Sequence, residues 1–168
     1  SGLGGSIQND GAVTPASVTI IGYGTFNSNT TFGLTINSKG AITLANITAN
    51  GNTNHGMEIV NNAGTGGVTL TGLNTFVSNV GHGAFILSSG NVSVTKITGD
   101  NNAQSGLLIN TTGAVTITCG SFNVNSWYGW EVLNASSATM KGVFTAGNTL
   151  GDYNTVVPLT VTRACPLP

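Results

Sequence analysis

The chain has 168 residues, a formal net charge of -1, and charged side chains at only 5% of its positions. A chain of this length buries a sizeable core in one domain. Its near-zero charge excludes the basic surface that binds nucleic acid or an anionic membrane, and no apolar run reaches the roughly 18 residues that cross a bilayer. Hydrophobic residues make up 39% of the chain and occur in short regular runs, which favours a folded protein over a disordered one.

Short strand signals recur along the chain, each with apolar and hydroxyl residues in alternation. The first is Val18-Thr-Ile20, and four more follow at Ile42-Thr-Leu44, Val68-Thr-Leu70, Val92-Ser-Val94 and Val115-Thr-Ile117. This alternation is typical of half-buried strands. A second strand signal follows in several repeats, at Thr25-Phe26, Thr75-Phe76 and Ser121-Phe122.

A longer pattern comes next in each repeat: Asn, three residues, Gly, an apolar residue, any residue, and a second apolar residue. It starts at six asparagines, the last of them with Asp152 in place of the glycine: Asn29, Asn52, Asn79, Asn102, Asn125 and Asn148. The intervals are 23 residues, except for 27 between Asn52 and Asn79. The longer interval coincides with the turn-rich loop 61–67, where we expect four inserted residues.

Three short strands and three turns in about 23 residues predict one coil of a parallel β-helix, because a propeller blade needs roughly 40 residues or more. We therefore expect an all-β solenoid of about six to seven coils with three short strands per coil, right-handed by the crossover rule. Residues 17–157 hold the repeats. Residues 1–16 form an N-terminal extension or edge segment for assembly, and residues 158–168 form a C-terminal strand and tail.

Stacking of the coils about 4.8 Å apart brings equivalent residues together. The six repeat asparagines should form a ladder whose side chains satisfy turn backbone groups in neighbouring coils. We expect the glycine four residues later either to adopt a positive φ or to let the backbone turn tightly.

The repeat phrases "ITANGNTNHGMEIVNNAG" and "FVSNVGHGAFILSSGNVSV" resemble the β-strand repeat regions of large secreted bacterial surface and adhesin proteins. Those regions belong to the pectin-lyase-like class of right-handed parallel β-helices. The resemblance covers about residues 17–157 and implies the fold. The class includes lyases, glycosidases, adhesins and structural filaments, so the resemblance leaves the activity open.

The carboxylates argue against catalysis. Glu58 and Glu131 share one repeat position three coils apart, or roughly 14 Å at the strand spacing. Glycosidases need a pair about 5 to 10 Å apart. The acidic calcium cluster that the resemblance implies for a lyase is missing from the sequence. We expect no catalytic residue, no enzyme activity and no cofactor.

His55 and His82 occupy equivalent positions in neighbouring coils, which predicts imidazoles about 5 Å apart on the surface. A bridging metal is one interpretation. The favoured one is two exposed turn residues in a variable position that also holds Phe32, Ser105 and Tyr128, so no metal site is predicted. Phe32, His55, His82 and Tyr128, with Trp127 and Trp130 nearby, form a candidate aromatic strip for a glycan or a protein partner. Trp130 takes the first apolar position after the repeat glycine and is expected in the core, whereas Trp127 and Tyr128 are expected to be exposed in a turn. The alternative is that these rings cover a corner of the solenoid.

Two other features leave alternatives open. Cys119 and Cys165 form either one disulfide, as in an oxidising compartment, or two buried thiols. A column of hydroxyl residues resembles an ice-binding surface, although ordinary solvent-facing strand propensity explains it as well. The column is Thr19, Thr43, Thr69, Ser93 and Thr116.

The ends of the solenoid lack a strong cap, and bare strand edges recruit other chains. The leading hypothesis is therefore a secreted structural protein, a filament subunit or cell-surface module that self-associates end to end. The alternative is a glycan-binding or polysaccharide-processing β-helix.

Overall fold

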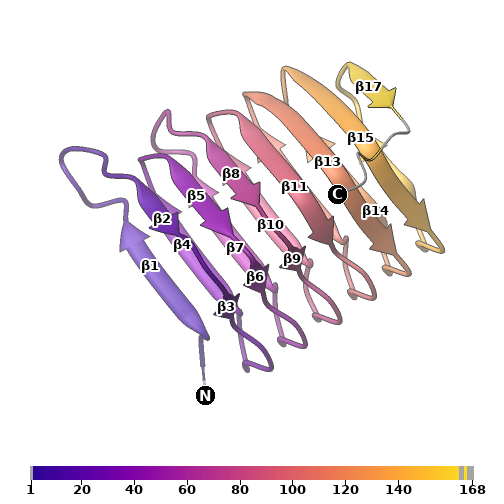
Figure 1. Cartoon of the computed structure of the whole chain (residues 1–168), viewed down its shortest axis with the longest axis horizontal. Helices are drawn as coiled ribbons and strands as arrows, with labels where there is room; N and C mark the ends of the chain where they lie inside the picture. Colours follow the sequence, from indigo (N-terminus) through magenta and orange to yellow (C-terminus); the bar gives the residue numbers. More distant parts are fainter. Residues whose placement is uncertain (1, 163–164, 166–168) are drawn as a thin grey trace.

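The computed structural model describes residues 2–162 and Cys165, and over these residues the chain is a parallel β-solenoid of about six turns that contains strands and no helix (Figure 1). The predicted fold class is confirmed. Residues 163, 164 and 166–168 of the predicted C-terminal tail, and Ser1 of the N-terminal segment, lie outside the described residues.

The first sheet takes one strand from each coil and has seven parallel strands. In spatial order they are β1 (Gly5–Asn9), β4 (Leu34–Ser38), β7 (Met57–Asn61), β10 (Ala84–Ser88), β12 (Leu107–Thr111), β14 (Tyr128–Leu133) and β16 (Gly151–Thr155). Part of the predicted N-terminal segment is therefore the edge strand of this sheet. The register stacks one buried aliphatic column, Ile36, Ile59, Ile86, Ile109 and Val132.

The second sheet faces the first across the core. Its main path, from one end of the solenoid to the other, is β2 (Val18–Ile20), β5 (Ile42–Ala45), β8 (Val68–Thr71), β11 (Val92–Thr98), β13 (Ala114–Asn123), β15 (Ser137–Ala146) and β17 (Leu159–Thr162). The two-residue strands β3 (Gly24–Thr25), β6 (Ile47–Thr48) and β9 (Asn74–Thr75) lie beside this path in the first three coils.

The prediction of three strands in every coil is wrong for the later coils, where the first two strands merge. The chain bends at one residue with a left-handed φ, namely Lys96, Cys119 or Gly142, and ladder pairing resumes directly after it. In two earlier coils an extra exposed residue, Tyr23 or Leu73, stands at this bend and separates the strands. In the coil between these two, β5 and β6 are separated by the left-handed Asn46 alone, with no added residue.

The predicted site of the four-residue insertion is also only partly right. Asn61 pairs with Ser88 and Val68 pairs with Val92, so the turn between β7 and β8 holds three extra residues. The fourth is Leu73 at the bend, since Leu70 pairs with Val94 but Asn74 pairs with Ile97. The insertion is split because a solenoid accepts added residues wherever a corner can bulge into solvent.

Large and small residues alternate along one inward column of the second sheet, which reads Phe26, Ala49, Phe76, Gly99, Phe122 and Thr145. Phe76 and Phe122 are fully buried. A Cβ at Gly99 would lie only 3.0 Å from Cδ1 of Phe122. Each ring thus occupies space in the neighbouring coil, so a ring fits at every second coil.

Candidate functional site

The six repeat asparagines form the predicted ladder along one corner of the solenoid. The Oδ1 atom of Asn102 accepts hydrogen bonds from the backbone N–H of Asn79 at 2.9 Å and from its Nδ2 at 3.1 Å. The Nδ2 of Asn102 donates to the Phe76 carbonyl at 3.0 Å and to Asn125 Oδ1 at 3.1 Å. One side chain therefore connects three coils, and the pattern repeats from Asn29 to Asn148.

The repeat glycine does not have a positive φ, so the first reason proposed for it is wrong. A Cβ at Gly56 would lie 2.6 Å from the Gly83 carbonyl oxygen and 2.8 Å from Asn79 Nδ2. The repeat glycine is needed because the next coil and its ladder amide approach the glycine backbone so closely that a Cβ atom does not fit. The left-handed residues directly precede the ladder asparagines instead, at Ser28, Gly51, Ser78, Asn101, Val124 and Gly147.

A second ladder, which sequence reasoning missed, runs through the position before the repeat glycine; we call these residues the histidine column: Phe32, His55, His82, Ser105 and Tyr128. His55 Nδ1 accepts from the His82 backbone N–H at 2.8 Å, and His82 Nδ1 accepts from the Ser105 N–H at 3.1 Å. Ser105 Oγ accepts from the Tyr128 N–H at 3.4 Å. Phe32 has no acceptor, and the His55 N–H donates to Asn54 Oδ1 instead.

The histidines are not the exposed turn residues of the sequence interpretation. The His82 side chain is 6% exposed and His55 is half-buried, with ring centroids 5.0 Å apart. Burial lowers the pKa of each histidine to about 4, and the neighbouring His82 adds to the effect on His55. Both are therefore neutral at pH 7 and serve as hydrogen-bond acceptors.

This arrangement also argues against a bridging metal. Because each Nδ1 accepts a backbone hydrogen bond, the single ring proton sits on Nε2, and that nitrogen has no lone pair for a cation. Nowhere in residues 2–162 and Cys165 do three or more His, Cys, Asp or Glu side chains gather to hold a metal ion.

The aromatic strip exists, but its members differ from the predicted set. The centroid of the Phe85 ring lies 5.7 Å from that of His55 and 6.1 Å from that of His82, and Trp127 meets His82 edge-on at 5.6 Å. Phe32 packs on His55 at the other end. Phe85 lies on the outward face of β10, outside the repeat position of the histidines, so the repeat pattern does not predict it as a member of the strip.

Of Trp127 and Tyr128, which the sequence predicts to be exposed, only Trp127 is strongly exposed, at 42%. Tyr128 is half-buried. Trp130 lies in the core, where Tyr153 stacks on it with ring centroids 4.9 Å apart.

The two carboxylates share an outward column of the first sheet, but they do not meet. Glu58 on β7 and Glu131 on β14 are three strands apart, or roughly 14 Å at the strand spacing, with Phe85 and Leu108 between them. Glu131 is buried and accepts from Ser105 Oγ and from Asn154 Nδ2. Desolvation raises the pKa of the half-buried Glu58.

The hydroxyl column on the outer face of the second sheet is longer than predicted. The register adds Thr139 on β15 and Thr160 on β17, so a threonine or serine stands at this position on all seven strands of the main path. The adjacent column holds Thr71, Thr95 and Thr118 but is interrupted by Ala45 and Lys141.

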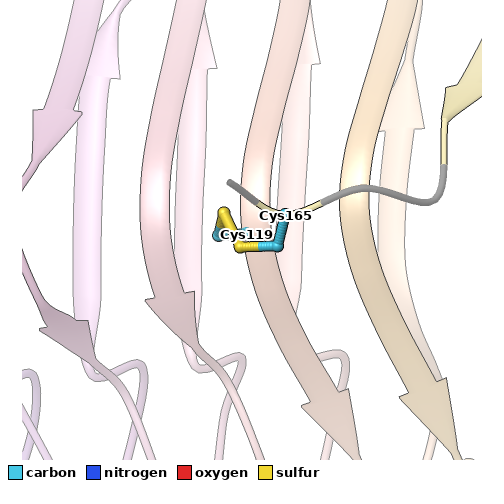
Figure 2. The surroundings of a disulfide bond; sticks show 2 residues. All are labelled: Cys119 and Cys165. Carbon is cyan, nitrogen blue, oxygen red and sulfur yellow. A yellow bond between two sulfur atoms is a disulfide. The ribbon is translucent and has the colours of Figure 1, made fainter. Parts of the chain in front are cut away.

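The two cysteines form a disulfide with Cα atoms 5.3 Å apart. Cys165 follows β17 in the chain but lies over β13, two strands back in the sheet, as Figure 2 shows. Gly142 on the intervening β15 makes this crossing possible, since a Cβ there would lie 2.6 Å from the Cys165 Cβ. The bond borders an open groove of about 330 Å³ that also contacts Leu73, Lys96 and Phe144.

Comparison with family models, with curated proteins and with solved structures gives no match for this chain. None of the described residues forms a helix with the length and apolarity needed to cross a membrane.

Proposed function

We propose that the chain is a secreted, extracellular structural protein: a β-solenoid module of a filament or cell surface that self-associates through its open ends and is not an enzyme. The observation that carries this proposal is that, among the described residues, the outermost strands of both sheets pair on one side only. β1 and β2 lie at one end, and β16 and β17 at the other. Such edges present backbone groups ready to pair with another chain.

The low charge of the chain supports self-association. Only nine of 168 residues carry a formal charge, and the net charge is -1. Copies of the chain therefore repel one another weakly at every ionic strength. The resemblance to the pectin-lyase-like class and to bacterial surface repeats supports the same proposal, and membership of that class is part of it.

The separation of the acidic residues supports a non-catalytic role. Glu58 and Glu131 lie too far apart to act on one glycosidic bond, and the Glu131 carboxylate is buried among its own hydrogen-bond donors. The Ser105 hydroxyl is fully buried, so substrate cannot reach it as a nucleophile.

Electron microscopy with sedimentation of the purified chain tests the proposal. We expect elongated particles whose length grows with protein concentration. A monodisperse monomer at high concentration overturns the proposal.

A second candidate function is glycan binding, favoured by the exposed Trp127 ring, which contacts His82, the ring on which Phe85 stacks. Exposed aromatic rings offer apolar faces with polar edges, which suit sugar rings. A glycan array with the intact chain tests this, with Trp127→Ala as the variant expected to lose signal. Equal binding by the variant contradicts this site, and a depolymerisation assay checks for polysaccharide processing.

A further inference from the structure

The two ends of the solenoid are staggered in opposite senses. β1 comes before the first full coil and belongs to the first sheet, whereas β17 comes after the last full coil and belongs to the second sheet. The described strands therefore begin in one sheet and end in the other, so a second copy placed after β17 continues the alternation of the sheets (Figure 1).

We propose that copies of this chain join head to tail in one defined register, in which β17 of one copy and β1 of the next lie in a single shared coil. This inference rests on the proposed function and specifies its interface. β1 of the second copy pairs with β16 and β2 of the second copy pairs with β17, so the first sheet and the leading half of the second sheet continue across the joint.

Side-chain sizes match across this joint. The inward column of the first sheet reads Leu34, Met57, Ala84, Leu107, Trp130 and Tyr153, and β1 contributes Gly5 to it. Tyr153 is 52% exposed because no coil covers it in the single chain. The joint places Gly5, the smallest residue of the column, over Tyr153, one of the largest.

A cavity opens at the C-terminal end and is positioned to receive the next copy. It measures about 170 Å³ and is lined by Trp130, Met140, Val143, Thr145, Tyr153 and Val161. At the opposite end of the chain, Ile7 and Phe26 are only partly buried against the core. The shared register brings Ile7 over Thr155, and the Phe26 ring, which lies against Gly5, toward this cavity.

The second sheet matches in the same way. Continuing the pairing of β15 with β17 sets Val18 over Leu159, Thr19 over Thr160 and Ile20 over Val161. Apolar residues then face the core on both sides, and the hydroxyl column continues unbroken from one copy to the next.

An engineered cross-link tests the register. Thr19 and Thr160 are exposed and lie at opposite ends of one chain, roughly 29 Å apart at the strand spacing. A disulfide between cysteines at these positions needs Cα atoms about 4.4 to 6.8 Å apart, which only two stacked copies provide. The double variant Thr19→Cys/Thr160→Cys should give a ladder of covalent oligomers on non-reducing electrophoresis.

The matched control is Thr19→Cys/Thr162→Cys, which moves one cysteine two residues along the same face. It should give no ladder beyond covalent dimers, and neither should the single variants. Filaments of the parent chain without an in-register ladder overturn this joint but leave the proposed function standing. If neither filaments nor the ladder of covalent oligomers forms, both the joint and the proposed function are overturned.

Discussion

Asparagine side chains stabilise this solenoid because each one connects three coils at a corner where strand pairing stops. Asn102 is 1% exposed, and its side chain takes part in four hydrogen bonds. Its amide replaces bonds that the turn backbone otherwise makes with water. The ladder is therefore a structural element of the fold, and its residues are poor candidates for ligand contact.

Replacing Asn102 with Ala should lower the free energy of unfolding by about 2 to 4 kcal/mol, because several buried backbone groups lose their partners. Chemical denaturation followed by circular dichroism measures the change. Asn62→Ala, at an exposed turn position, is the control and should change stability by less than about 0.5 kcal/mol. Equal effects of the two variants contradict the role of the ladder.

Val124 shows strain at the residue before a ladder asparagine. Its φ is 57°, a region where a β-branched residue is unfavourable, and its side chain is 59% exposed. Asn101 holds the equivalent position one coil earlier with nearly the same φ, 57°. Val124→Asn should therefore stabilise the protein by about 1 kcal/mol.

The matched control for this substitution is Val80→Asn. Val80 is similarly exposed, at 60%, but is not among the residues with positive φ. Its replacement should shift the thermal midpoint little. If Val80→Asn stabilises the protein as much as Val124→Asn does, the gain comes from replacing an exposed apolar side chain with a polar one, which contradicts relief of backbone strain.

The two histidines predict a loss of stability in acid. Their pKa in the folded protein is lowered to about 4 from 6.5. Between these pH values the unfolded chain binds more protons, so stability is full above about pH 6.5 and falls as the pH approaches 4. Protonation also removes the Nδ1 acceptors that bind the next coil.

Denaturation midpoints measured from pH 7.5 to 4 test this. His55→Ser/His82→Ser is the control, because Ser105 shows that a serine accepts the same kind of bond without titrating in this range. The double variant should lose most of the slope. The raised pKa of Glu58 acts in the opposite sense in both proteins. An unchanged slope in the variant would falsify the assignment to the histidines.

At the scale of the strands, the sequence predicted those features that have a repeating chemical signature. The asparagines and the apolar pairs that follow them recur with a nearly constant spacing, and that spacing indicated the coil, the stacking and the buried columns. The bend in the second sheet has no such signature. Gly22, Asn46, Gly72, Lys96, Cys119 and Gly142 share a left-handed φ there and little else.

The histidine column was misread for a related reason. Its members are chemically unlike one another, and variable positions are usually exposed. Three of them, His55, His82 and Ser105, share an acceptor atom at the right distance from the next coil, which His and Ser provide with different side chains. The distance from Nδ1 or Oγ to the next coil depends on the folded backbone, so the sequence pattern does not reveal the role of such a position.

The disulfide should act on the last strand. β17 pairs only with β15 among the described strands, and three of its four residues are exposed. The bond closes a loop with a sequence separation of 46 residues, for which chain entropy alone predicts about 4 kcal/mol. Cys119→Ser/Cys165→Ser should therefore release β17 while leaving the central coils folded.

Hydrogen exchange measures this at the level of the element. Amides of β17 should exchange much faster in the double serine variant, whereas those of β11, with a paired strand on each side, provide the internal control. Uniform acceleration throughout the chain contradicts a local role for the disulfide, and unchanged β17 exchange shows that strand pairing alone holds it.

At the scale of the whole molecule, the staggered ends make growth directional. A copy whose N-terminal edge is blocked keeps a working C-terminal end. In β1 the Gly5 N–H donates to the Gly33 carbonyl of the neighbouring coil. Alternation along a parallel strand then points the Ser6 N–H toward the free edge. Ser6→Pro removes that donor while keeping the bonds that β1 makes with β4, since proline is tolerated on edge strands.

Ser6→Pro should therefore cap filaments without unfolding the chain. The proline edge cannot dock on a growing C-terminal end, but the variant's own C-terminal end still accepts the N-terminal edge of an unmodified copy. Added at a tenth of the total protein, it should leave filament number unchanged or higher and shorten mean length, as measured by electron microscopy. The control is Ser6→Ala, which keeps the N–H and should leave filament length unchanged. Thr30→Pro lies away from the proposed joint but alters a ladder turn, so it is not a suitable control. Shortening by both Ser6 variants contradicts backbone pairing at β1 as the basis of growth.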